Sequence, residues 1–216
     1  MRKNHSGFAR YNFSGFEIYT TRRNAILTKQ GHLWYYFDMK LFDLAYSIAT
    51  ENHGILTATE ARANGIASKD LVRWVRLGRF IKCGNGVYKS TQYPYSEDDP
   101  YAIAVAQCGK DAYLCGESVI GLLRLMPVSV DNIHIRTPHR LRRKLPNGYE
   151  TSAGKIGYIP VNIGGIMCQK PFDAIKECIP SHIGERLLQA AQTAYTTGHI
   201  GKAELEKLKE EITHAR

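Results

Sequence analysis

The sequence of 216 residues predicts an α+β protein. Three observations lead to this fold class. Apolar residues recur at helical spacing after Met39, the tripeptide 84–86 (Gly-Asn-Gly) has the composition of a tight hairpin turn, and the stretch NIHIRT alternates like a strand. The chain accordingly divides into an extension (1–38), a helical segment that ends in a hairpin (39–93) and a mixed α/β segment (94–216).

Composition sets limits on the class of protein. Hydrophobic residues make up 44% and charged residues 23%, as in ordinary globular proteins, and no apolar run approaches the roughly 18 residues of a membrane span. Five scattered cysteines without a CxxC pair argue against a disulfide scaffold or structural zinc, so we expect reduced thiols and a cytoplasmic protein. The net charge of +9 favours a polyanionic partner only if the cations are clustered.

The extension, residues 1–38, holds nine aromatic residues and no sustained helix or strand period. We expect either that Met39 is the natural start or that 1–38 is loosely held. The alternative is an aromatic arm packed on the body.

Segment 39–93 predicts three helices and a hairpin in order. A first helix runs from Met39 to a stop at Gly54, and a short strand follows. Thr57 with Glu60 three residues later forms a capping-box pattern for a second helix over 58–64. Gly65 suits a sharp turn, and Ser68 is the expected N-cap of a third helix that reaches residue 77. This order is typical of a winged helix-turn-helix domain.

The third helix carries the clearest charge pattern. At about 100° per residue, Lys69, Arg73 and Arg76 fall within an arc of roughly 60°. Apolar Leu71 and Trp74 lie on the opposite side. We expect Arg73 and Arg76 to read guanine edges in the major groove of DNA, and Lys69 and Lys82 to contact phosphate. The alternative is an amphipathic helix with a hairpin and no ligand. The predicted interface comprises Ser68, Lys69, Arg73, Arg76, Arg79, Lys82, Asn85 and Lys89.

This segment resembles the N-terminal winged module of the AbiEi family, the antitoxins of type IV toxin–antitoxin systems. The resemblance rests on Thr57, Ala61, Arg62, Gly65, Leu71, Arg73, Gly78, Arg79, Gly86, Val87 and Tyr88. It implies a DNA-binding autorepressor that binds inverted repeats in its own promoter. It also implies a nucleotidyltransferase-like toxin as functional partner, countered without a stable complex. Asn85 departs from the pattern, because the family has a basic residue there.

Segment 94–216 predicts alternating helices and strands, with a basic run after the strand NIHIRT. We expect helices at SEDDPYAIAVAQCG, GESVIGLLRLM, PFDAIKECI, GERLLQAAQTAYTTG and KAELEKLKEEITHA, and strands at AYLC and KIGYIPVNI. The basic run is either a solvated loop or a second patch that contacts phosphate or RNA. That patch comprises Arg136, His139, Arg140, Arg142, Arg143 and Lys144.

Enzyme motifs do not emerge from the sequence. HExxH, GxSxG, a phosphate loop and the deaminase H-x-E pattern are missing. Acidic residues gather on the C-terminal helix, interleaved with lysines in the manner of a solvated face. We therefore expect no catalytic residue, no metal and no cofactor. The alternative is a nuclease, or another nucleic-acid-processing enzyme, guided by the winged segment.

Overall fold

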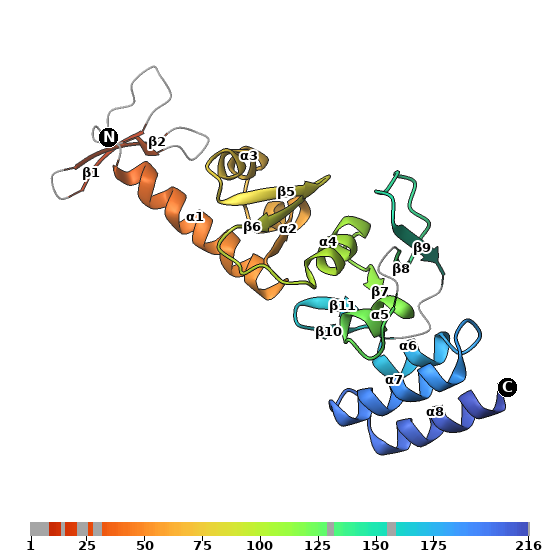
Figure 1. Cartoon of the computed structure of the whole chain (residues 1–216). Coiled ribbons are helices and arrows are strands. Elements are labelled where there is room, and N and C mark those ends of the chain that lie inside the picture. Colours follow the sequence, from red (N-terminus) through yellow and green to blue (C-terminus); the bar gives the residue numbers. More distant parts are fainter. Residues whose placement is uncertain are drawn as a thin grey trace. The chain divides into compact units, whose positions relative to one another are not determined.

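The computed structural model describes residues 9–13, 16–20, 26–27, 32–128, 132–154 and 159–215, with side chains from Asp38 onward. The chain forms two compact units, Met1–Ser47 and Ile48–Arg216, and Figure 1 shows their elements. Helices and strands are mixed in the α+β manner expected. Among the described residues, no helix combines the length and apolar character required to cross a membrane.

The first unit contains a small antiparallel sheet and most of a long helix. Strands β1 (Ala9–Phe13), β2 (Phe16–Thr20) and β3 (Ile26–Leu27) pair in the order β1-β2-β3. Helix α1 runs from His32 to Glu51. The helix expected to start at Met39 therefore begins seven residues earlier, and the predicted boundary at 38/39 falls inside it. The sequence does not reveal this start, because residues 33–37 (LWYYF) are consecutive large apolar and aromatic residues with no helical period.

The second unit begins with a three-stranded antiparallel sheet and two short helices. Strands β4 (Ile55–Thr57), β5 (Phe80–Gly84) and β6 (Val87–Ser90) pair in the order β4-β6-β5. Helices α2 (Ala58–Ala63) and α3 (Ser68–Arg76) connect β4 to β5. Strand β6 lies in the centre, and all four of its residues are buried.

Local chemistry explains where α2 and α3 begin. The capping box is confirmed, because Thr57 Oγ1 accepts from the Glu60 amide at 3.2 Å and the Glu60 carboxylate accepts from the Thr57 amide at 2.9 Å. Gly65 takes φ +78° in the turn. The prediction that Ser68 caps α3 is wrong. Ala67 holds the extended N-cap conformation without a side-chain bond, directly after buried Ile66, whose amide donates to the Ala61 carbonyl oxygen at 2.8 Å.

A five-stranded mixed sheet forms the middle of the second unit. It contains β7 (Tyr113–Leu114), β8 (Ile133–Thr137), β9 (Tyr149–Ala153), β10 (Val161–Ile163) and β11 (Ile166–Cys168), in the order β10-β11-β7-β8-β9. Helices α4 (Asp99–Cys108) and α5 (Glu117–Leu122) precede and follow strand β7 in the sequence, as expected. Strand β9 was not predicted. Of KIGYIPVNI, the structure shows β10, and residues 155–158 lie outside the described part.

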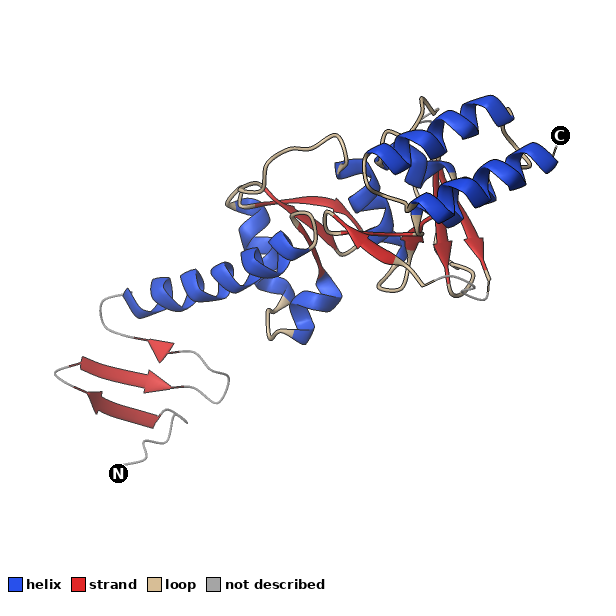
Figure 2. Cartoon of the chain, turned by 90° about the horizontal axis from the view of Figure 1, so that it is seen from below, coloured by secondary structure: helices blue, strands red, loops and turns tan. Residues whose placement is uncertain are grey.

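Three helices follow the sheet and enclose a second core. Helices α6 (Pro171–Glu177), α7 (Gly184–Thr196) and α8 (Lys202–His214) match the predicted segments. Leu187, Leu208 and Ile175 are fully buried between them. Figure 2 shows α7 and α8 side by side at the C-terminal end of the chain.

One core joins the segment predicted as a winged domain to the segment after it. Ile55 of β4 and Val87 of β6 belong to the same buried cluster as residues of α4, β7, β8 and β11, including Val105 and Ile135. The predicted division at 93/94 therefore runs through a shared core, and residues 48–216 form one unit.

Candidate nucleic-acid interface

Helix α3 has one buried face and one cationic face. Leu71 and Trp74 are almost completely buried, and the Trp74 ring lies 6.0 Å from that of Phe80 on β5. Lys69 and Arg76 are exposed, and neither forms an ion pair with any residue that the structure describes. Packing on one side thus fixes the helix so that two available cations face solvent.

Arg73 differs from its two neighbours in the predicted stripe. Its guanidinium lies 3.2 Å from the Asp70 carboxylate, and its side chain is only about a third exposed. Asp70 is itself buried, at 6% exposure. The prediction that Arg73 reads bases is not supported by this arrangement, because its charge is already matched within the helix.

The β5–β6 hairpin provides the next part of the predicted interface. Lys82 is exposed on the edge strand β5, and Asn85 is exposed at the tip between Gly84 and Gly86. Arg79 is half-buried, and Ser68 is exposed on the first turn of α3. Exposed apolar residues accompany the cations: Val72 on α3 and Ile81 on β5 are 46% and 57% exposed.

Lys89 does not belong to this surface, which corrects the prediction. Its Nζ lies 2.6 Å from Asp99 Oδ1, and the two residues are 9% and 5% exposed. The cause is the sheet order, since Lys89 sits on the central strand opposite Ile55 on one side and Ile81 on the other. Its ammonium therefore points into the protein and ties β6 to the start of α4.

Two further side chains complete the environment of this ion pair. His53, also buried, places Nε2 3.2 Å from Asp99 Oδ1 and Nδ1 3.0 Å from the Gly164 carbonyl oxygen. Nδ1 must carry a proton, because a carbonyl oxygen only accepts. The Tyr93 ring contacts both partners of this carboxylate, with Lys89 Nζ 5.1 Å from its centroid and the His53 ring at 5.4 Å. Lys89 on β6 and the His53 ring thus both contact the carboxylate of Asp99 on α4.

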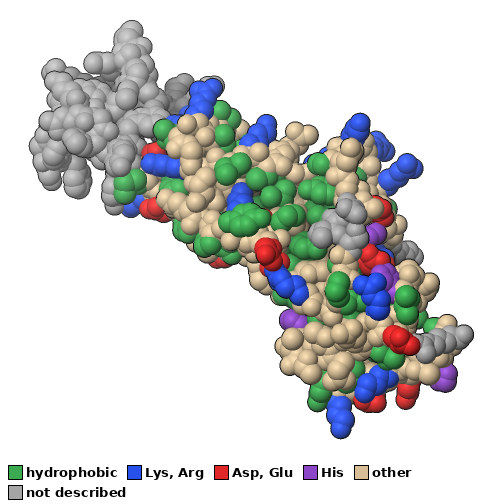
Figure 3. Space-filling view, in the orientation of Figure 1, with side chains coloured by type: hydrophobic (Ala, Val, Ile, Leu, Met, Phe, Trp, Pro, Cys, Tyr) green, Lys and Arg blue, Asp and Glu red, His purple; other side chains and the backbone are tan. Residues whose placement is uncertain are grey.

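The second predicted patch is divided by the structure. Arg136 does not belong to the patch, because its guanidinium forms an ion pair with Glu177 and its Nε lies 3.5 Å from Ser152 Oγ. The remaining members are exposed and lie in the connection between β8 and β9: His139, Arg140, Arg142, Arg143 and Lys144. Figure 3 shows Lys and Arg side chains gathered over α3 and again over this connection.

The cysteines are all free thiols. Burial raises the pKa of the Cys108 and Cys115 thiols to about 11, and of Cys168 and Cys178 to about 12. At neutral pH these four are protonated packing residues. Within the described part of the chain, His, Cys, Asp and Glu nowhere gather in a group of three that would hold a metal ion.

Sequence reasoning missed Lys110, an exposed lysine just after α4. It lines a hollow shared with Asn85 of the hairpin tip and Arg143 of the β8–β9 connection. Its neighbours Gly109 and Asp111 give no pattern from which this position follows.

Comparison with known proteins adds no assignment. No model of a known protein family matches the chain. A search of curated proteins likewise finds no significant match.

Proposed function

We propose that the second unit binds duplex DNA as a winged helix-turn-helix protein, with α3 as the recognition helix and the β5–β6 hairpin as the wing. The observation that carries the proposal is the placement of Lys69 and Arg76 on the solvent face of a helix whose opposite face is anchored by Trp74 and Leu71. Lys82, on the edge strand beside the hairpin tip, supports it as a third exposed cation.

Each residue takes a role that fits its environment. Arg76, exposed and unpaired among the described residues, presents a planar guanidinium suited to a guanine edge. Lys69 and Lys82 are point charges suited to phosphate oxygens. Arg73 forms an ion pair with Asp70 within α3, so it stabilises the helix and does not read bases.

The biological role follows from the resemblance to AbiEi antitoxins. We propose that the protein represses the operon that encodes it and counters a nucleotidyltransferase-like toxin. DNA binding is carried by the charged face of α3, whereas the toxin partner rests on the resemblance alone.

The test is the salt dependence of DNA binding. Each phosphate contact contributes a slope of about −0.9 in log K against log salt, so affinity should fall steeply between about 50 and 200 mM salt. Lys69→Ala should reduce that slope by about 0.9, and Arg76→Ala should cost about 1–3 kcal/mol and relax base preference at one position. Lys202→Ala, an exposed cation on α8, is the matched control. A flat salt response, or equal effects of all three changes, would refute the proposal.

A further inference from the structure

The connection between β8 and β9, residues 138–148, is held at both ends and in its middle. At its start, Thr137 Oγ1 donates to the His139 carbonyl oxygen at 2.9 Å, and at its end the Gly148 carbonyl oxygen accepts from the Ile133 amide at 2.7 Å. Leu141 and Leu145 pack against the first hydrophobic core. The backbone that carries the cations is therefore anchored, and binding a ligand there costs less entropy than ordering a free tail.

The basic loop, defined here as residues 139–144, has no internal neutralisation. Residues 138–148 contain no acidic side chain. Arg140, Arg142, Arg143 and Lys144 are exposed and form no ion pair with any residue in the described ranges. Arg140 and Arg142 also line a shallow hollow around Leu141. Such a group of unpaired cations on an anchored loop is typical of an anion-binding surface.

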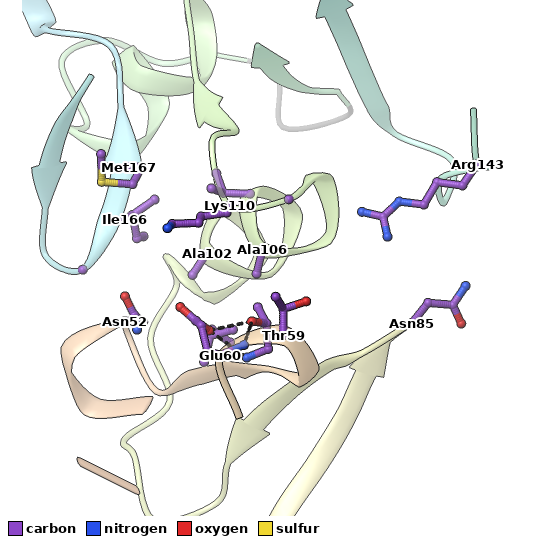
Figure 4. A pocket seen from close by; sticks show the side chains of 15 residues that line it. Asn52, Thr59, Glu60, Asn85, Ala102, Ala106, Lys110, Arg143, Ile166 and Met167 are labelled. Carbon is purple, nitrogen blue, oxygen red and sulfur yellow. Dashed lines mark hydrogen bonds between the residues drawn. The ribbon is translucent and has the colours of Figure 1, made fainter. Parts of the chain in front are cut away.

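A hollow of about 310 Å³ connects the basic loop to the hairpin tip. Figure 4 shows the Lys110 side chain extending over it and the Arg143 guanidinium directed toward it above Asn85. Glu60, the one carboxylate among its described lining residues, is occupied by its bonds to Thr57. The tip residue Asn85 carries no charge, and Lys110 and Arg143 provide the cations that line this hollow.

We propose that the basic loop and Lys110 form a second phosphate-binding surface for the same DNA duplex that α3 binds. In the view of Figure 1, α3, the β5–β6 hairpin and the β8–β9 connection all lie along the upper edge of the second unit. A backbone that leaves α3 past the hairpin tip meets Arg143 and Lys110 next. This inference rests on the proposed function, and it assigns the loop to affinity rather than to base reading.

The experiment measures binding of the full chain to a mixed-sequence duplex of about 30 base pairs, because phosphate contacts carry no sequence information. The variant Arg142→Ala/Arg143→Ala keeps both leucine anchors. Its control, Lys170→Ala/Lys202→Ala, removes the same charge from exposed positions near and on the C-terminal helices. We expect the loop variant to lower the magnitude of the slope of log K against log salt by about 1.8. Between about 50 and 200 mM salt, the variant should therefore lose roughly twelvefold less affinity than the parent chain loses. Lys110→Ala should lower the slope independently by about 0.9.

The outcomes separate the two proposals. If Lys69→Ala and Arg76→Ala weaken binding but the loop variant matches its control, the second surface is refuted and the recognition helix stands. If the parent chain does not bind the duplex, both proposals fail. If the loop variant keeps its DNA affinity and loses affinity for a single-stranded RNA of the same length, the loop faces RNA and the inference is overturned.

Discussion

Replacing Lys89 by Met should strongly destabilise the second unit. The ion pair of Lys89 with Asp99 is short, at 2.6 Å, and both residues are more than nine-tenths buried. Without Lys89, the buried Asp99 carboxylate keeps only the His53 ring beside it among the described residues, and removing one partner of a buried ion pair typically costs about 3–5 kcal/mol. That is a large fraction of the roughly 5–15 kcal/mol that stabilises a typical domain. Methionine retains most of the aliphatic volume of lysine, so the loss of stability measures the effect of removing the charge.

Urea unfolding followed by circular dichroism measures this loss. With a slope of about 2 kcal/mol per M urea, the midpoint should fall by about 1.5–2.5 M. The double variant Lys89→Met/Asp99→Asn leaves no charge on either residue and should be less destabilised than Lys89→Met alone. If Lys89→Met lowers the free energy of unfolding by less than about 1 kcal/mol, the reasoning is contradicted, because a loss of that size is typical of a solvent-exposed ion pair. Folded Lys89→Met should also keep the parental DNA salt slope, because this lysine lies off the interface.

Three further predictions concern stability and reactivity. Burial raises the pKa of four thiols to about 11 or 12, whereas unfolded thiols titrate near 8.5. The folded state thus holds protons that the unfolded state releases, and stability should fall from about pH 8.5 to 11 by up to about 1.4 kcal/mol per pH unit for each thiol. A urea midpoint that does not change over this range would contradict the assignment. Cys83, the one half-buried cysteine, should be the first to react with a thiol reagent in native protein, and slowly, since burial raises its pKa too; equal labelling of all five would show otherwise. Gly54→Ala should destabilise more than Gly65→Ala in thermal melts. Both glycines have φ near +75°, a conformation that costs an alanine about 1–2 kcal/mol at either position. At Gly54, in addition, the new methyl group would lie 2.5 Å from the Tyr93 ring.

Local signals in the sequence predicted much of the fold. The capping box at Thr57, the turn at Gly65 and the hairpin tip at Asn85 are set by neighbours within four residues, and the structure shows all three. The helices with Pro or acidic residues at the start and Gly near the end were found for the same reason. Strand β9 was missed because four of its five residues are exposed and no alternation marks it.

The interface was harder to predict, because burial of a charge depends on distant partners. Lys89 is buried only because β4 pairs with β6 and Asp99 begins the next helix. Arg136 is not available in the second patch, because it forms an ion pair with Glu177, which lies 41 positions later in the sequence. Arg73 was within reach of prediction, since Asp70 stands three residues before it. A run of cationic residues in a sequence thus shows where positive charge is concentrated. Ion pairs with acidic residues in the folded protein then decide which of these cations remain available to a ligand.

The buried carboxylate of Asp99 has a consequence for engineering. It contacts Lys89 of the hairpin and His53 of the turn after α1, while Ile55 and Val87 lie in a core completed by α4 and the second sheet. A fragment cut after the hairpin would carry a lysine without its counterion and an open apolar face. The helices and hairpin of this protein therefore do not form a separable domain, and any fusion or domain exchange must move the second unit whole.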